Sequence, residues 1–133
     1  MRDYIRGGVK ITERGWPGHF ICARNCVFRR NTLLEYGGRH WIVSTVGQMI
    51  SSLTNKIDSI GYNRWYETMC FEAKLIDGYW DANVSKEIDI NQDWGLWAES
   101  WEELVEKYPE VDNVANEMHD KIVDEMIERI KVL

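Results

Sequence analysis

The sequence predicts an α+β fold in one domain, residues 1–133, with an N-terminal antiparallel β-sheet over about residues 4–90 and two C-terminal helices. Two patterns support this prediction. Up to residue 90, short runs rich in alternating or β-branched residues are separated by glycine-rich and Asp-Gly turn signals. Beyond residue 100, apolar residues recur every three or four positions, which is the period of a helix. A chain of 133 residues that is 44% hydrophobic also has the length and composition of one folded core.

The predicted strands follow one another with short turns between them. Gly37-Gly38 separates two extended runs and is a typical hairpin signal, and Asp77-Gly78 marks a second turn. Residues 51–61 are polar and turn-rich, so we expect a loop there. Extended runs are expected at residues 4–6, 9–11, 19–28, 32–36, 40–46, 66–74 and 84–90.

Two helices are predicted in the last third of the chain. Ser100 and Glu103 form a capping-box pattern, which begins a helix that ends before Pro109. A longer helix is expected over residues 111–131, because its apolar residues form a stripe along one side. Such a stripe covers the sheet or pairs with the helix of a second subunit.

Charge is distributed unevenly along the chain, whose net charge is −6. Residues 1–45 hold eight Lys/Arg against three Asp/Glu, whereas residues 87–133 hold four against fourteen. The acidic end would repel a long polyanion, so we expect no DNA or RNA binding, whereas a compact anion held by arginines is compatible with it. The alternative explanation is a solvated acidic helix face, with contacts between basic and acidic parts of neighbouring subunits.

The sequence predicts neither a membrane segment nor a metal site. No run of eighteen apolar residues occurs, and the first residues lack an apolar signal region, so a cytoplasmic location is expected. The three cysteines, Cys22, Cys26 and Cys70, argue against a disulfide framework and are interpreted as reduced, buried residues. His19 with Cys22 and Cys26 lacks the spacing of a zinc site, so neither a metal nor another cofactor is expected.

The segment from Arg14 to Asn31 concentrates four arginines around Trp16 and His19. Guanidinium groups match the geometry of phosphate, and an aromatic plane stacks on a base. A phosphate-bearing small ligand is therefore the first hypothesis for this segment. Trp16, in a glycine- and proline-rich loop, is either a stacking platform or a residue that closes one end of the core. His19 is a candidate partner for a ribose hydroxyl or a phosphate.

Strand alternation divides the arginines of this segment between two faces. If the extended conformation continues past Phe28, Arg24 and Arg30 share one face and Arg29 lies on the other. Should the Arg30 face be the core, its cation needs an anionic partner. A ligand phosphate and a carboxylate from the C-terminal helix both meet that need, and the sequence leaves the two alternatives open.

Catalytic motifs are missing from the sequence. It has no Gly-x-Ser-x-Gly elbow, no phosphate-binding P-loop and no His-Glu-x-x-His. His19 and His40 lack the context of a phosphodiesterase pair, and the acidic residues between Glu67 and Asp81 are interpreted as ordinary strand and turn charges. We therefore expect a protein that is not an enzyme.

Four segments spread over the chain form one recognisable pattern. They are Glu13-Arg14-Gly15-Trp16-Pro17-Gly18-His19-Phe20-Ile21-Cys22, Phe28-Arg29-Arg30-Asn31-Thr32-Leu33, Tyr66-Glu67-Thr68-Met69 and Ala115-Asn116-Glu117-Met118-His119. In this pattern, which covers nearly the whole chain, the protein resembles small phage proteins of the first Thoeris anti-defence family.

The resemblance implies a phage or prophage anti-defence protein that acts as a sponge. Members of that family bind the cyclic ADP-ribose isomer made by bacterial TIR-domain immune proteins, and some also bind cyclic oligonucleotides. They sequester the signal without cleaving it and so block Thoeris immunity. They are β-rich with C-terminal helices and assemble into dimers and hexamers, with the ligand at a subunit interface. A homo-oligomer is therefore expected.

The candidate ligand-binding residues are chosen for their chemistry. Arginines supply charge for a pyrophosphate, an aromatic plane suits adenine, and asparagines near the helical stripe are typical of caps or contacts. The predicted set is Trp16, His19, Arg24, Arg29, Arg30, Asn113, Asn116 and Arg129. The sequence leaves two other functions open: a protein-binding inhibitor, such as an anti-CRISPR protein acting through its acidic C-terminal part, and a structural prophage protein with a self-associating helix.

Overall fold

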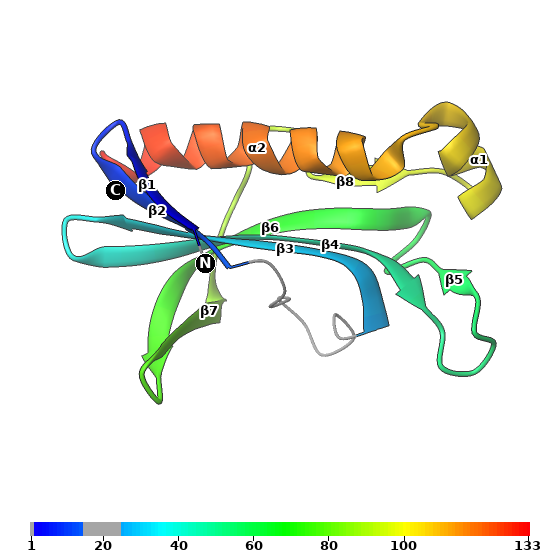
Figure 1. The fold of residues 1–133 in the computed structure, drawn as a ribbon, viewed down its shortest axis with the longest axis horizontal. Helices are drawn as coiled ribbons and strands as arrows, with labels where there is room; N and C mark the ends of the chain where they lie inside the picture. Colours follow the sequence, from blue (N-terminus) through cyan, green and yellow to red (C-terminus); the bar gives the residue numbers. More distant parts are fainter. Residues whose placement is uncertain (1, 15–24) are drawn as a thin grey trace.

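The protein is an antiparallel sheet with a long helix lying along one face (Figure 1). The structure is a computed structural model and describes residues 2–14 and 25–133. The strands are β1 (Arg2–Arg6), β2 (Val9–Glu13), β3 (Cys26–Tyr36), β4 (Arg39–Ile50), β5 (Ile57–Asp58), β6 (Arg64–Ile76), β7 (Tyr79–Ile88) and β8 (Gly95–Trp97). The helices are α1 (Trp101–Lys107) and α2 (Val111–Ile130). The predicted α+β fold, with the sheet first and two helices last, is confirmed.

Strands that follow one another in the sequence are neighbours in the main sheet. The exception is β5, which lies between β4 and β6 in the sequence but is not between them in the sheet. Within the described residues the order is β1-β2-β3-β4-β6-β7, while β5 pairs with β4 and β8 with β6. All of these pairs are antiparallel. The predicted turns lie where expected: Gly37-Gly38 joins β3 to β4, and Asp77-Gly78 joins β6 to β7, with positive φ at all four residues.

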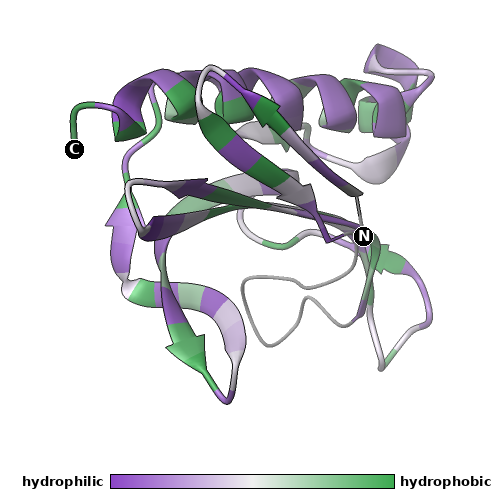
Figure 2. Cartoon of the chain, turned by 60° about the vertical axis from the view of Figure 1, so that its left-hand side comes forward, coloured by the Kyte–Doolittle hydropathy of each residue, from purple (hydrophilic) through white to green (hydrophobic). Residues whose placement is uncertain are grey.

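The main core lies between α2 and one face of the sheet. Helix α2 has polar and apolar residues interspersed along its length (Figure 2), and its buried residues include Ile122 and Met126, both fully enclosed. They pack in one cluster with buried sheet residues such as Leu34, Val43 and Cys70. A smaller cluster of Ile42, Phe71 and Ala82 occupies the opposite face. The sheet therefore has an α2 face and an opposite face, and both contain buried residues.

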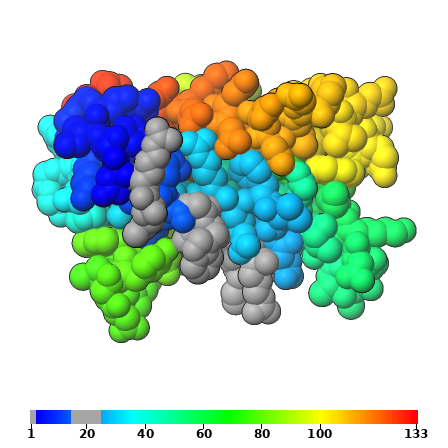
Figure 3. All heavy atoms as spheres, viewed as in Figure 1, coloured from blue at the N-terminus to red at the C-terminus, as the bar shows by residue number. Residues whose placement is uncertain are grey.

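The β1–β2 hairpin lies against the C-terminal part of α2, as the blue and red atoms in Figure 3 show. Arg6 of this hairpin forms a 2.5 Å ion pair with Asp124 of α2. The hairpin turn at Gly7-Gly8 uses positive φ angles, which glycine adopts without steric cost. This contact joins the first and last elements of the chain.

Several predicted strand boundaries were wrong, among them the end of the run at 40–46, since β4 continues to Ile50. Residues 26–28 of the expected run at 19–28 and the expected run at 32–36 belong to one continuous strand, β3, because the polar residues between them have partners on both faces. Residues 19–24 of the expected run lie outside the described part of the chain. Strand β7 begins at Tyr79 rather than at residue 84, directly after the turn. The short strands β5 and β8 were not predicted.

No helix in the described part of the chain has both the length and the apolar character needed to cross a membrane. Both helices agree closely with their predicted bounds. Ser100 caps α1, since its side-chain oxygen accepts a 3.1 Å hydrogen bond from the Glu103 backbone N–H. Helix α2 begins at Val111, two residues after Pro109.

Candidate functional site

The sequence-predicted ligand residues are spread over several parts of the protein. Trp16, His19 and Arg24 lie outside the described residues. Arg29 and Arg30 belong to β3, and the remaining three, Asn113, Asn116 and Arg129, belong to α2. The structure brings together two of the described five, Arg30 and Asn116.

Arg30 points from β3 toward α2 and is bound by two carboxylates. Its Nη2 atom lies 3.0 Å from Glu13 Oε1 and 2.8 Å from Asp120 Oδ1. Its Nη1 atom is also 3.3 Å from Asn116 Oδ1. Burial lowers the pKa of Arg30, but the hydrogen bonds to Glu13 and Asp120 outweigh burial and leave the pKa above its ordinary value. Of the two alternatives that the sequence left open, the structure shows the carboxylate from the C-terminal helix, joined by one from β2.

The other two α2 candidates form local contacts at opposite ends of the helix. The Asn113 side-chain amide donates to Glu110, at 2.6 Å, near the helix start. Arg129 pairs with Glu125 at 3.0 Å and donates to the backbone oxygen of Asp89. At about 1.5 Å of rise per residue, the two α-carbons are about 24 Å apart along the helix. Asn113 and Arg129 therefore do not belong to one compact site within a single chain.

The opposite face of the sheet contains a different, half-buried arginine, Arg14, which follows β2. Its backbone N–H continues the β2–β3 ladder by donating to the Asn31 carbonyl. Its Nε donates to Asn31 Oδ1 at 2.9 Å, and its Nη1 donates to the Trp80 carbonyl at 2.7 Å. The guanidinium also lies over the Tyr79 ring, 4.6 Å from its centroid. Strand β3 and the β6–β7 hairpin thus hold this side chain from two sides.

The remaining nitrogen of Arg14 is unsatisfied. Its Nη2 is buried and has no hydrogen-bond partner within the described part of the chain. Burial lowers the pKa of Arg14, and the influence of Tyr79 and Asp81 opposes this only in part. A buried donor of a cation that lacks a partner carries a free-energy cost, which an anion bound at that nitrogen would remove.

Buried polar groups lie on the same face of the sheet as Arg14, and the β6–β7 hairpin adds two aromatic residues nearby. Asn31 and Ser44 are cross-strand partners of β3 and β4, and both are buried. Trp80 stacks on His40 with ring centroids 3.7 Å apart and an interplanar angle of 12°. Arg29 shares the parity of Asn31 along β3, so its side chain leaves the strand on this face. This group of residues, which we call the Arg14 site, comprises Arg14, Arg29, Asn31, Ser44, Tyr79 and Trp80.

A hollow of about 380 Å³ lies beside β6, where Arg64 is held between aromatic and acidic groups. Arg64 Nε forms a 2.7 Å ion pair with Glu67, and its guanidinium lies over the Trp94 and Trp97 rings. Glu87 and Asp89 also line this hollow. Because its one arginine is already paired and the other charges are negative, this hollow suits a phosphate poorly.

Cys26 and Cys70 are buried as free thiols. Burial, more than the nearby charges, raises the pKa of the Cys70 thiol, so it stays protonated as a core residue. The expectation that these two cysteines are buried is confirmed, while Cys22 lies outside the described residues.

Sequence reasoning missed most of the Arg14 site. Arg14 was recognised as part of the arginine cluster but was not among the predicted ligand residues, and Tyr79 and Trp80 were not singled out. The turn at Asp77-Gly78 predicts a strand after it, but nothing local shows that Trp80 reaches back to a residue 66 positions earlier. Only the sheet order places them together.

Comparison with known proteins does not identify the chain: no protein-family model, no curated protein and no solved structure matches it. We therefore infer the function from the residues and their geometry, together with the sequence resemblance.

Proposed function

We propose that the protein is a phage anti-defence sponge that binds a cyclic ADP-ribose isomer without cleaving it and so blocks TIR-based Thoeris immunity. The observation that supports this most directly is the Arg14 site, because it offers a buried guanidinium nitrogen with no partner among the described residues. The resemblance to the Thoeris anti-defence family supplies the identity of the ligand. The proposed place of action is the cytoplasm of the infected bacterium.

In this proposal the Arg14 site binds the pyrophosphate of the signal. Arg14 Nη2 donates to a phosphate oxygen, and Arg29 supplies a second cation from the same face. Tyr79 is already in contact with the guanidinium, and the Trp80 backbone carbonyl accepts a hydrogen bond from Arg14 Nη1. Trp16 follows Arg14 by two residues in the sequence, and we assign it the role of stacking on the adenine. Binding the signal needs no catalytic acid or base, which is consistent with sequestration of the intact signal.

The resemblance further leads us to propose a homo-oligomer, a dimer or a hexamer, with the ligand between subunits. This assembly would allow Asn113 and Arg129, which lie far from the Arg14 site along α2, to contact ligand held by another subunit.

Isothermal calorimetry with ADP-ribose and cyclic ADP-ribose tests the proposal. Replacing Arg14 with Gln removes a charge-assisted hydrogen bond, so the affinity should fall by about tenfold or more. The matched control is Arg6→Gln, an exposed arginine paired with Asp124, whose loss should leave the affinity unchanged. The proposal is overturned if neither ligand binds the wild-type protein, or if Arg14→Gln binds as tightly as the control.

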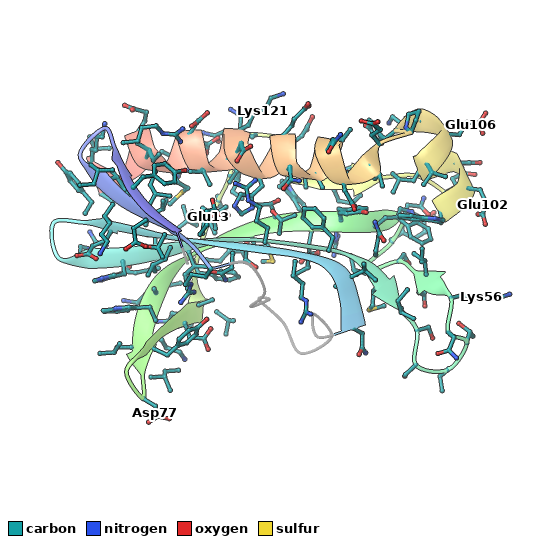
Figure 4. The ribbon with its side chains drawn as sticks, in the orientation of Figure 1. Glu13, Lys56, Asp77, Glu102, Glu106 and Lys121 are labelled. Carbon is teal, nitrogen blue, oxygen red and sulfur yellow. The ribbon has the colours of Figure 1, made fainter. Side chains whose placement is uncertain are left out.

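A second candidate function, inhibition of a partner protein through nucleic-acid mimicry, is favoured by the surface of the helices. The exposed acidic residues of α1, α2 and the turn between them outnumber the two exposed lysines there, Lys107 and Lys121. Glu102 and Glu106 project outward from α1, as does Lys121 from α2 (Figure 4). The exposed carboxylates are Glu102, Glu103, Glu106, Glu110, Asp112, Glu117, Asp120, Asp124 and Glu128.

The two functions respond differently to mutation. Under mimicry, Glu106→Lys with Glu117→Lys should abolish protection of a phage in cells that carry the targeted defence, whereas Arg14→Gln should have little effect. Under sequestration the pattern is reversed. Phage plaque counts in cells with and without a Thoeris system distinguish them.

A further inference from the structure

The core beneath α2 contains a continuous chain of polar contacts centred on His119. His119 is fully buried on α2, and its two ring nitrogens each meet a threonine hydroxyl: Nδ1 lies 2.7 Å from Thr45 Oγ1 and Nε2 lies 2.7 Å from Thr32 Oγ1. Thr45 Oγ1 also lies 2.6 Å from Thr68 Oγ1, and Thr32 Oγ1 lies 3.0 Å from Glu13 Oε1. The chain thus joins β6, β4, α2, β3 and β2 inside an otherwise apolar core.

The carboxylate at one end fixes the direction of every hydrogen bond in this chain. Glu13, ionised and paired with Arg30, only accepts, so the Thr32 hydroxyl donates to Glu13. Thr32 then accepts from His119, which places the ring proton on Nε2. Nδ1 is consequently an acceptor for the Thr45 hydroxyl, which in turn accepts from Thr68. Each of these side chains therefore has one defined proton position.

The same strands hold the Arg14 site on their other face. Glu13 is the sequence neighbour of Arg14, and Arg30 and Thr32 are the neighbours of Asn31. Because adjacent strand residues point to opposite faces, the residues of the chain and those of the Arg14 site alternate along β2 and β3. Glu13 and Thr32 are also cross-strand partners, directly beside the hydrogen bond from the Arg14 backbone to Asn31.

We propose that His119 is a positioning residue for the Arg14 site: its Nε2-protonated ring, acting through Thr32 and Glu13, fixes how β2 and β3 present Arg14 and Asn31 to an anion. The inference rests on the proposed function for its ligand, an ADP-ribose-type anion. The proton arrangement in the chain does not depend on that ligand.

Protonation of His119 would disturb this arrangement. An imidazolium donates from both nitrogens, so the Thr45 hydroxyl must turn away from Nδ1 and lose its present role as donor to the ring. The positive charge would also lie fully buried and close to Arg30. The charged groups near the ring are Glu13 of β2, Arg30 of β3 and Asp120 of α2, and the two carboxylates are already paired with Arg30. No free carboxylate among these groups compensates a second cation.

Nitrogen-15 NMR of the histidine side chains tests the proton arrangement without any ligand. The expected spectrum of His119 has a protonated Nε2 and an unprotonated Nδ1, unchanged from neutral pH to mildly acidic pH. A proton on Nδ1, or an imidazolium at neutral pH, overturns the inference.

Calorimetry with cyclic ADP-ribose isomers tests positioning. Thr45→Val removes the donor to Nδ1 with almost no change in shape, and we expect the affinity to fall by about fivefold or more. Thr45→Ser keeps the hydroxyl and should restore binding. If Thr45→Val does not fold, Thr68→Val breaks the chain one link further away and should shift the affinity in the same direction.

The outcomes separate this inference from the proposed function. No binding to the wild-type protein contradicts the proposed function and, with it, the positioning role, while the NMR result still decides the proton arrangement. Tight binding to the wild-type protein with equal affinity for a folded Thr45→Val variant overturns positioning alone.

Discussion

Arg29 and Arg30 show how two identical, adjacent residues acquire different roles. Strand alternation sends Arg30 to the α2 face, where Glu13 and Asp120 bind it, and sends Arg29 to the opposite face with Asn31. The sequence predicted this division. It did not predict which anion faces Arg30, because Glu13 lies 17 positions before it and Asp120 lies on a helix far along the chain.

The two arginines should differ in their effect on stability. Arg30→Met leaves Glu13 partly buried without its cation, so we expect a loss of about 1–3 kcal/mol in the free energy of unfolding. Arg29→Met, the matched control, forms no ion pair with another described residue and should change stability by no more than about 0.5 kcal/mol. Urea unfolding followed by tryptophan fluorescence measures both. Equal losses would contradict the assignment of Arg30 to a structural role.

His119 should make the protein less stable in acid. Burial, and next the charge of Arg30, hold the pKa of His119 well below its ordinary value of 6.5 in the folded protein. The unfolded chain binds a proton near pH 6.5, so it takes up more protons than the folded chain below that pH. The stabilisation from neutral His119 is therefore complete above about pH 6.5 and decreases as the pH falls.

Urea unfolding at about pH 7.5 and about pH 5.5 measures this contribution. Between these two pH values the free energy of unfolding of the wild-type protein should fall by about 1.4 kcal/mol more than that of His119→Gln. The variant has no titrating group at position 119. The same pH dependence in both proteins would mean that His119 is not the group responsible.

At the scale of elements, the sequence predicted both helices and most of the sheet. The cap at Ser100, the stop at Pro109 and the helical period after Val111 are local signals, and each has its structural counterpart. Strands β5 and β8 have only two and three residues and exist through pairing with β4 and β6. A strand defined by its partner has no periodicity of its own, so sequence reasoning could not find it.

The continuity of β3 was missed for a related reason. Arg29-Arg30-Asn31 looks like a polar break when only its neighbours in the sequence are considered. In the folded protein Arg14 hydrogen-bonds Asn31, and Glu13 binds Arg30. Partners from the end of β2 and from Arg14, the residue that follows it, thus make a polar segment stable inside a central strand.

The N-cap of α1 gives a prediction at this scale. Ser100→Ala removes the hydrogen bond from its side chain to the Glu103 N–H and should lower the free energy of unfolding by about 1 kcal/mol. Ser52→Ala, at an exposed turn position, is the control and should be nearly neutral. A neutral Ser100→Ala would indicate that α1 unfolds independently of the rest.

At the scale of the whole molecule, the uneven charge is accommodated within one chain. The basic N-terminal strands lie against the acidic helix, and Arg6–Asp124 and Arg30–Asp120 are ion pairs between these two parts. The charge asymmetry therefore does not require contacts between neighbouring subunits. Arg14 and Arg29 lie on the face of the sheet away from α2, where the acidic helix does not neutralise their charges.

The central claim is that the protein retains a cyclic ADP-ribose-type signal intact, and a release experiment tests it most directly. The wild-type protein is incubated with the cyclic ADP-ribose isomers, separated from free ligand and heat-denatured, and the supernatant is analysed by liquid chromatography and mass spectrometry. We expect recovery of unmodified cyclic ligand, in smaller amount from Arg14→Gln than from Arg6→Gln. Recovery of linear ADP-ribose, or of no nucleotide at all, would contradict it.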